Sequence, residues 1–388
     1  MEREFDIVIF GATGFSGTLI AEYLIDKYGD ETRIALAGRN ETKLNILREE
    51  LGVAIPVLIG DSDDLAAMRS IAKRARLVVS CAGPFILYGS NMVQACAELG
   101  TDYVDVTGEV YWSGQMMAAH EETAKKSGAR IISFCGFDSV PSDLGVYLLQ
   151  KRAVASRGKP FNRIKMRVKA LRGAGSLGGS IATMEDMEKR VKTQADIIHF
   201  MINPFALSPG FEGTPQPSGM EPTLDEEIDS WAAPFLMSGI NTKVVHRTNW
   251  LLGLPYGENF VYDEMSSTGP GEEGKAKIEH SIETLGGFKY DLSIQPGKPG
   301  EGPDKAAREA GYYSIAFYGI DDGEVVDEIT LADDCDPGCG STCKLVGESA
   351  MCLLKDGISV GGGFWTPVAA MGDQLYTRLT ERKIIDIS

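Results

Sequence analysis

Short apolar runs alternate with amphipathic stretches through the first third of the chain. The apolar runs are rich in β-branched residues and occupy positions 5–10, 33–37, 54–59, 77–81, 102–109 and 130–135. Stretches with helical periodicity separate them, at positions 15–24, 41–51, 63–75, 91–99 and 112–126. Apolar runs of this kind are typical of strands that are buried on both faces. Their regular alternation with helices predicts an α/β fold built on a doubly wound parallel sheet.

The pattern changes beyond about residue 160. Apolar and basic residues alternate over 164–170, which is the period of a half-buried antiparallel strand. A glycine-rich loop at 173–180 opens a long helix that is expected to end near Phe200. Residues 203–223 are dense in Pro and Gly, so we interpret them as an irregular excursion and a candidate lid over the substrate.

Strand signals continue in the rest of the middle region. Residues 243–252 and 259–265 read as strands, and 312–319 with 324–331 flank a hairpin turn at 320–323. These features predict a second, α+β domain with a mixed or antiparallel sheet. The tail returns to helical periodicity at 342–354 and 365–379.

A glycine-rich turn follows the first strand and opens the first helix. Its residues fit a GxxGxxG form of the dinucleotide fingerprint, in which the first glycine allows a tight turn, the second lets backbone approach a pyrophosphate, and the third lets helix and strand pack closely. The phosphates would lie on free N–H groups at the helix N-terminus. A purely structural turn is the alternative. The predicted cofactor contacts are Gly11, Thr13, Gly14, Phe15, Ser16 and Gly17.

Basic residues follow the second strand, where an NAD enzyme commonly carries an acidic residue for the ribose 2′-hydroxyl. Arg39, Asn40 and Lys43 stand there instead. Because a guanidinium suits a 2′-phosphate, these residues favour NADP(H) as the cofactor. The alternative is that Arg39 and Lys43 form a solvated helix face.

The expected domain boundaries follow from these patterns. Residues 1–145 would form an NADP-binding Rossmann domain, 146–345 an α+β substrate domain, and 346–388 a set of C-terminal helices that pack back on the Rossmann domain.

The carboxyl ends of the later strands should meet at the edge where such sheets bind ligands. There we expect further cofactor contacts from Asp61, Ser62, Cys81, Ala82, Gly83 and Pro84. We expect the substrate to contact Phe137, Ser139, Gly178, Gly179 and Ser180. The alternative for Ser139, as for Ser142, is that it caps the following helix.

Hydride chemistry belongs to the cofactor, so the protein must position the acceptor and offer one acid. The candidates predicted at the carboxyl edge are Asp138, Tyr88, Glu109 and Tyr111. Tyr147 and Lys151 form a Tyr-x-x-x-Lys arrangement, which short-chain dehydrogenases use to protonate an oxygen, and remain an alternative general acid.

Composition narrows the function further. The formal net charge of −17 over 388 residues argues against binding nucleic acid or an anionic membrane surface. No apolar run approaches the roughly 20 residues of a membrane helix. The seven cysteines indicate free thiols in a reducing cytoplasm, so we expect a soluble cytoplasmic protein. Cys335, Cys339 and Cys343 fit no usual ligand spacing, so we expect no metal.

Taken together, these motifs resemble the saccharopine dehydrogenase-like oxidoreductases, and most of all the trans-acting enoyl reductase group. The segments that carry the resemblance are 11–17, 37–39, 82–89, 102–109, 135–143, 178–180, 298–303, 336–338 and 366–373. The resemblance implies an NADPH-binding Rossmann domain, a middle α/β domain and reduction of a C=C bond in an enoyl thioester or lipid-like precursor.

Two other functions stay open. One is a C=N reductase or amino-acid dehydrogenase like saccharopine reductase, which would need a basic cluster for substrate carboxylates such as Arg163, Arg167 and Arg172. The other is a non-catalytic NADP(H)-sensing protein. We expect a homodimer, because two-fold pairing is the commonest assembly of soluble enzymes.

Overall fold

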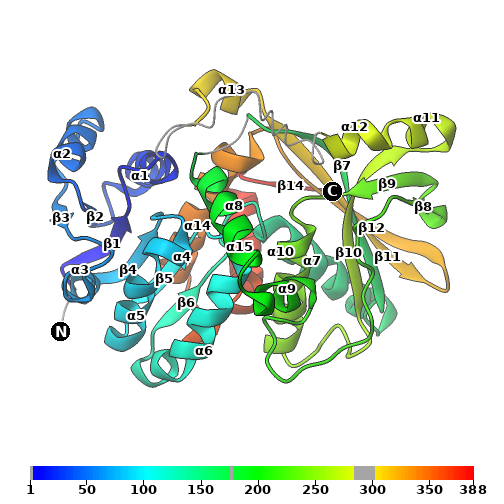
Figure 1. Cartoon of the computed structure of the whole chain (residues 1–388), viewed down its shortest axis with the longest axis horizontal. Helices are drawn as coiled ribbons and strands as arrows, with labels where there is room; N and C mark the ends of the chain where they lie inside the picture. Colours follow the sequence, from blue (N-terminus) through cyan, green and yellow to red (C-terminus); the bar gives the residue numbers. More distant parts are fainter. Residues whose placement is uncertain (1–2, 175–177, 284–301) are drawn as a thin grey trace.

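The computed structural model describes residues 3–174, 178–283 and 302–388. Within them the chain forms two seven-stranded sheets that lie side by side (Figure 1). Helices α14 (Thr342–Lys355) and α15 (Pro367–Glu381) lie between the two sheets.

The first sheet has the strand order β13-β6-β5-β4-β1-β2-β3. Its strands are β1 (Phe5–Phe10), β2 (Ile34–Gly38), β3 (Val57–Ile59), β4 (Ala75–Ser80), β5 (Asp102–Asp105), β6 (Arg130–Ile132) and β13 (Gly363–Trp365). All neighbouring pairs are parallel. The predicted doubly wound parallel sheet is therefore confirmed.

Helices cover both faces of the first sheet. Alternate residues of each strand point to opposite faces, and because both sets are apolar, both faces must be buried. In β1, Ile7 and Ile9 pack in one cluster, whereas Val8 and Phe10 pack in another. The first cluster includes α1 (Phe15–Tyr28), α2 (Glu41–Glu50) and α14, and the second includes α3 (Leu65–Arg74), α5 (Ser90–Leu99) and α6 (Val110–Ser127). The short α4 (Phe85–Tyr88) lies at the carboxyl end of β4.

The second sheet has the order β14-β12-β11-β7-β10-β9-β8. Its strands are β7 (Arg163–Arg172), β8 (Thr223–Asp225), β9 (Ser230–Pro234), β10 (Val261–Gly269), β11 (Tyr312–Asp321), β12 (Glu324–Asp333) and β14 (Asp386–Ile387). Strands β7 and β10 are parallel, and the other pairs are antiparallel. The mixed sheet and the hairpin between β11 and β12 agree with the sequence analysis.

The remaining helices surround the second sheet and the junction. They are α7 (Val140–Arg157), α8 (Gly178–Val191), α9 (Ala195–Ile202), η1 (Glu226–Ile228), α10 (Ser238–Leu251), α11 (Gly271–Ala276), α12 (Ile278–Glu283), α13 (Lys305–Glu309) and the π-helix η3 (Pro337–Ser341). The expected long helix ending near Phe200 is thus two helices, α8 and α9. Residues 203–222 are irregular, as predicted.

The interpretation of residues 243–252 as a strand is wrong, because they belong to helix α10. Lys243, His246 and Arg247 are buried in this helix together with their apolar neighbours. A helix that is buried on most sides has no polar face, so its sequence lacks the 3.6-residue period.

Two smaller expectations also need correction. The strand expected over 130–135 ends at Ile132. In β7, Arg167 was expected on the exposed face, but its side chain is buried between Asp225 and Asp263. In this alternating stretch Arg167 therefore marks buried ion pairs, whereas Lys169 is exposed as expected.

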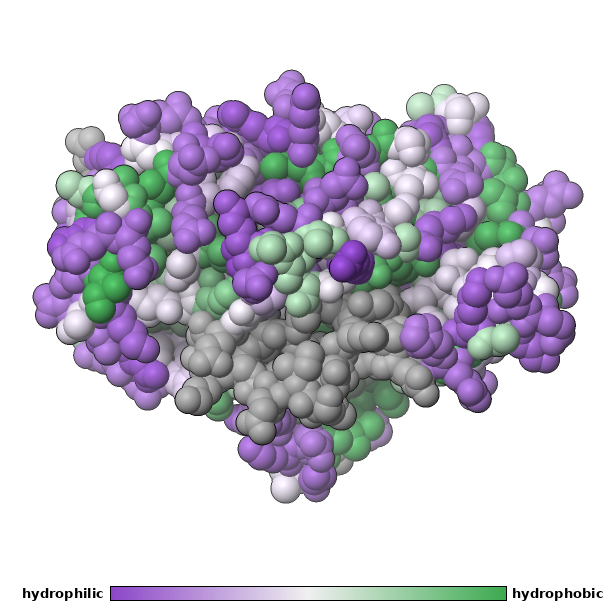
Figure 2. Space-filling model, turned by 90° about the horizontal axis from the view of Figure 1, so that it is seen from above, coloured by the Kyte–Doolittle hydropathy of each residue, from purple (hydrophilic) through white to green (hydrophobic). Residues whose placement is uncertain are grey.

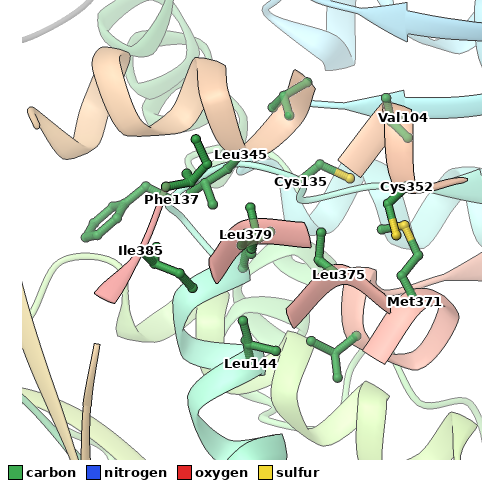
Figure 3. Close-up of a cluster of buried hydrophobic side chains, with 14 of the residues drawn as sticks. Val104, Cys135, Phe137, Leu144, Leu345, Cys352, Met371, Leu375, Leu379 and Ile385 are labelled. Carbon is green, nitrogen blue, oxygen red and sulfur yellow. The ribbon is translucent and has the colours of Figure 1, made fainter. Parts of the chain in front are cut away.

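The C-terminal segment joins the two sheets. Its strand β13 extends the first sheet beside β6, and β14 pairs with β12 of the second. Its helices α14 and α15 contribute to a core cluster that includes residues from both sheets. Figure 3 shows part of this cluster, with Val104, Cys135, Phe137, Leu144, Leu345, Cys352, Met371, Leu375, Leu379 and Ile385.

One face of the molecule is mostly polar. The face seen from above carries hydrophilic side chains over most of the coloured area, with apolar ones scattered among them (Figure 2). Among the described residues, no helix combines the length and apolarity needed to cross a bilayer.

Candidate functional site

The glycine turn between β1 and α1 is shaped by close backbone packing. Gly11 has φ +79°, and a Cβ there would lie 2.8 Å from the amide nitrogen of Ala82. A Cβ on Gly17 would lie 2.3 Å from the carbonyl oxygen of Gly11. Around Gly14 the only atom that such a Cβ would approach within 4 Å is that same oxygen, at 3.3 Å. Gly11 and Gly17 are therefore required by the close packing of the turn, and Gly14 is the least crowded of the three glycines.

The first turn of α1 fits a phosphate group. No side chain caps this helix, and its first turn contains no acidic residue. The N–H groups of Phe15, Ser16 and Gly17 precede any intrahelical acceptor, so they are free to donate to an anion at the positive end of the helix. Thr13 precedes the N-cap residue, Gly14. The donors present therefore match the diphosphate of a dinucleotide.

The basic residues lie after β2, on the neighbouring strand. Arg39 and Lys43 are exposed, and neither forms an ion pair with any described residue. The Asn40 side chain accepts a hydrogen bond from the backbone N–H of Lys43 at 2.9 Å, so it caps α2. The two cations are therefore free to meet a 2′-phosphate, while Asn40 orders the turn that carries them.

The other predicted cofactor residues lie along the same carboxyl edge. The Gly60 N–H donates to the Gly38 oxygen, which places Asp61 beside the turn that carries Arg39. Asp61 is exposed, whereas Ser62 is buried and its carbonyl accepts from Asn91. Residues 81–84 follow β4, and the Cys81 N–H donates to the Phe10 oxygen at 2.8 Å. This edge runs without a break from the end of β3 to the end of β4, and the residues predicted on it were Asp61, Ser62, Cys81, Ala82, Gly83 and Pro84.

Glu109 is buried, and its hydrogen bonds hold neighbouring segments in place at this edge of the sheet. Its carboxylate accepts hydrogen bonds from the backbone N–H groups of Phe85, at 2.7 Å, and Ile86, at 2.8 Å. It also accepts from the Thr183 hydroxyl at 3.2 Å, which joins α8 to α4. Burial raises the pKa of Glu109, but the amide donors favour its ionised form. The geometry fits a residue that positions α4 better than a proton donor.

The two tyrosine candidates differ in their surroundings. Tyr111 is buried, and its hydroxyl donates to the Asp196 carboxylate at 2.6 Å while its ring packs edge-on against Phe200. Tyr111 therefore joins α6 to α9 through a hydrogen bond that uses its hydroxyl proton. Tyr88 is half-buried at the end of α4 and remains at the edge.

Among the four predicted acid candidates, Asp138 has the surroundings that best suit a proton donor. It is half-buried, and among the described residues no hydrogen bond to its carboxylate is present. Its Oδ2 lies 3.1 Å from the position of a Cβ on Gly108, next to the side chain of Ile240. Burial raises the pKa of Asp138 to about 6. A carboxyl group with a pKa near neutrality can hold and deliver a proton.

A buried polar chain that the sequence analysis missed lies behind Asp138. The Ser139 hydroxyl donates to Asn241 Oδ1 at 3.3 Å, and Asn241 Nδ2 donates to Glu264 at 2.8 Å. The Tyr262 hydroxyl donates to the other oxygen of Glu264 at 2.7 Å. Burial raises the pKa of Glu264 to about 7. Ser139 is the N-cap residue before α7, but its hydroxyl makes no capping bond and donates to Asn241 instead.

A signal for this chain was present in the sequence. Two acidic residues, Asp263 and Glu264, are consecutive in a strand. Because successive side chains of a strand point to opposite faces of the sheet, each face receives one of these carboxylates. Asp263 meets Arg167 at 2.8 Å, and Glu264 meets Asn241 and Tyr262. The partners come from distant segments, which local patterns do not reveal.

The expected substrate residues are only partly brought together. Phe137 is not at the edge, because its side chain is buried in the core cluster (Figure 3). The centre of its ring lies 4.7 Å from that of the Tyr313 ring. Gly178, Gly179 and Ser180 begin α8, and their side-chain surroundings lie outside the described residues, as do positions 298–301 of the family motif. Ser139 contacts the polar chain described above.

Neither alternative constellation forms a second site. Tyr147 and Lys151 both bind Asp373 of α15 on the surface, which makes them a structural pair. In the basic cluster proposed for substrate carboxylates, Arg163 pairs with Asp263. Arg167 pairs with Asp225 at 2.5 Å as well as with Asp263. The strand therefore offers no free pair of cations.

The cysteines are all free thiols. Cys339 and Cys343 are buried at η3 and the start of α14, where the Asp336 carboxylate accepts from the Cys339 N–H at 2.7 Å. Burial raises the pKa of both thiols. Among the described residues, no group of three or more potential ligands could hold a metal ion.

Known proteins resemble the chain along its whole length. Residues 7–132 match the family model described as the saccharopine dehydrogenase NADP binding domain. A Mycobacterium tuberculosis protein named as a trans-acting enoyl reductase is 37% identical over 408 residues, covering 97% of this chain and 96% of the relative. A trans-acting enoyl reductase of Mycobacterium ulcerans is 32% identical, covering 99% and 97%.

A solved structure supports the fold. Apo saccharopine dehydrogenase (L-Glu forming) from Saccharomyces cerevisiae covers 99% of each chain with a TM-score of 0.53 and 13% identity, which is a likeness of fold alone. The chain thus contains an NADP-binding domain and is an NADP-dependent oxidoreductase. By its full-length similarity and its cofactor site, it belongs to the trans-acting enoyl reductase family, within the saccharopine dehydrogenase-like proteins.

Proposed function

We propose that the protein is an NADPH-dependent reductase of a conjugated C=C bond in an enoyl substrate, either a thioester or a lipid-like compound. The similarity to enoyl reductases, 37% over 97% of the chain, carries this proposal. It is supported by the carboxyl group of Asp138, which has no hydrogen-bond partner among the described residues and lies at the edge of the sheet that carries the glycine turn.

The reaction divides between cofactor and protein. The nicotinamide, when bound, supplies a hydride to the β-carbon of the conjugated bond. Asp138 donates a proton to the α-carbon, so that hydride and proton together saturate the bond. The pKa of Asp138, raised to about 6, keeps this group mostly protonated below pH 6 and leaves roughly one carboxyl in ten protonated at pH 7, far more than an ordinary Asp would retain. Glu109 holds α4 in place through two amide hydrogen bonds.

Apolar side chains beside the edge suit an acyl substrate. Ile86 and Thr183 both contact Glu109, and their neighbours Leu87 and Met184 are 44% and 41% exposed. Large apolar side chains next to a polar site commonly mark a ligand surface.

A C=N reductase acting on an amino acid is less well supported. Such a substrate needs cations for its carboxylates, yet Arg163 and Arg167 are already paired with Asp263 and Asp225. Arg172 is exposed and lies alone at the end of β7.

The experiment incubates the protein with NADPH and a panel of enoyl thioesters, enones and imines, and follows the nicotinamide absorbance. We expect oxidation of NADPH with the conjugated C=C acceptors. Oxidation with imines alone would support the C=N reductase. Tight NADPH binding without oxidation by any acceptor would support a sensing protein.

A further inference from the structure

An arginine from outside the nucleotide-binding sheet lies at the first turn of α1. Arg308 belongs to α13, which precedes β11 of the second sheet. Its guanidinium lies 5.6 Å from the centre of the Phe15 ring. Phe15 is the first residue of α1, so the charge of Arg308 lies at the end of the helix that fits a phosphate. This segment approaches closely, since a Cβ on Gly302 would lie 2.6 Å from the same ring.

The backbone of Arg308 is fixed in this position. Its carbonyl oxygen accepts hydrogen bonds from the N–H groups of Asp336, at 3.0 Å, and Gly311, at 3.3 Å. The buried Asp336 carboxylate in turn accepts from the N–H of Ala174 at 2.6 Å and from that of Cys339. Asp336 therefore ties three chain segments together and holds α13 beside α1.

The Arg308 guanidinium has no charged partner in the part of the chain that the structure describes. It is half-buried, and its Nη1 donates to the Pro303 carbonyl at 2.7 Å. No carboxylate lies within ion-pair distance among the residues that the structure describes. Arg163 and Arg167 of the second sheet, by contrast, pair with acids. An unpaired cation that adjoins free helix N–H groups has the charge and the donors for a phosphate group.

We propose that Arg308 binds the diphosphate of NADP(H) from the side opposite the glycine turn. Two groups would then meet the cofactor phosphates, the helix N–H groups from the first sheet and Arg308 from the segment beside the second. Arg39 reads the 2′-phosphate at the other end of the adenosine. Because Arg308 comes from outside the NADP-binding domain, cofactor binding also strengthens the contact between the two halves of the molecule.

The test compares Arg308→Gln with Lys305→Gln. Lys305 lies one turn earlier on the same helix, is 80% exposed and pairs only weakly with Glu309, at 3.7 Å. Both variants lose one positive charge, so long-range electrostatics are matched. Binding of NADP⁺ and of NAD⁺ is measured by calorimetry on the purified full-length protein. We expect Arg308→Gln to raise the Kd of both dinucleotides about tenfold, and Lys305→Gln to change either by less than twofold, as expected for one charge-assisted contact.

A third variant distinguishes the two phosphate positions. Arg39→Gln should raise the Kd of NADP⁺ and of adenosine 2′-monophosphate, and leave that of NAD⁺ unchanged. Arg308→Gln should leave adenosine 2′-monophosphate unchanged, and Arg308→Lys should recover part of the lost affinity. The proposal is overturned if Arg308→Gln leaves both dinucleotides unaffected, if it weakens NADP⁺ alone, or if Lys305→Gln has the same effect.

Discussion

Asp138 and Glu109 are carboxyl groups at the same edge of the first sheet, and their surroundings give them different roles. Glu109 accepts two backbone N–H groups and a hydroxyl, which stabilise its charge. Asp138 has no hydrogen-bond partner among the described residues, so only burial acts on it and its pKa rises to about 6. Residue type alone did not separate the two candidates in the sequence, because their partners come from other elements.

Asp138→Asn tests the acid. We expect kcat with an enoyl substrate to fall by about 10²-fold or more, the usual contribution of a general acid, while the Kd of NADP⁺ stays within about twofold. The wild-type kcat should fall as pH rises through about 6, because the acid must be protonated. The variant should lose this pH dependence. An unchanged kcat would assign the proton to another group, with Tyr88 as the next candidate.

Helix α1 shows how one element combines structural and binding glycines. Its Gly17 lies against the backbone of the preceding turn, whereas Gly14 is less crowded, with a single backbone oxygen 3.3 Å from the position of a Cβ. The sequence motif predicted three distinct uses for three glycines, and the packing of Gly11 and Gly17 agrees with two of them. The use of Gly14 remains a prediction about the cofactor.

Substituting these glycines separates stability from binding. In Gly17→Ala the new Cβ would lie 2.3 Å from a backbone oxygen, so we expect the midpoint of thermal unfolding to drop by several degrees. In Gly14→Ala the nearest atom lies at 3.3 Å and φ is −77°, so the loss of stability should be smaller than in Gly17→Ala while the Kd of NADP⁺ rises about tenfold or more. Thermal melts and calorimetry on both variants measure the two effects. Equal loss of stability in both would show that Gly14 is structural.

Elements with a regular pattern were predictable, and buried irregular ones were not. Strand β1 and the hairpin of β11 and β12 follow the period of buried or paired strands. The sequence pattern did not predict helix α10, because Lys243 and Arg247 are buried beside Val244 and Val245 and the helix has no amphipathic face. Strand β13 is only three residues long, so its sequence carries no clear period, and it is recognised as a strand by its pairing with β6.

Local sequence patterns likewise predicted only part of the candidate site. The glycine turn and Arg39 are local in sequence and were predicted as a unit. The chain from Ser139 through Asn241 to Glu264 joins α7, α10 and β10, so it depends on the tertiary fold. Arg308 likewise reaches α1 only because Asp336 holds its backbone in place.

At the scale of the molecule, several buried carboxyl groups affect how stability depends on pH. Burial raises the pKa of Asp105, Asp143 and Glu264 to about 7 and that of Asp138 to about 6. Between the ordinary carboxyl pKa and these values, the folded protein binds more protons than the unfolded chain. The free energy of unfolding should therefore be highest on the acidic side of this range and fall as pH rises towards 7. The net charge of −17 acts in the same direction, because repulsion grows as the carboxyls ionise.

Glu264→Gln tests this pH dependence at one group. The amide cannot ionise, so it removes the cost of a buried charge above pH 7, which corresponds to at most about 3 kcal/mol for a carboxyl shifted this far. We expect the variant to gain thermal stability relative to the wild type as pH increases from 5 to 8. Asp6→Asn is the control, since Arg33 and Arg76 lower the pKa of Asp6 to about 2. Both its folded and unfolded pKa lie below the range, so its stability difference should stay constant. A constant difference for Glu264→Gln as well would mean that Glu264 remains ionised throughout.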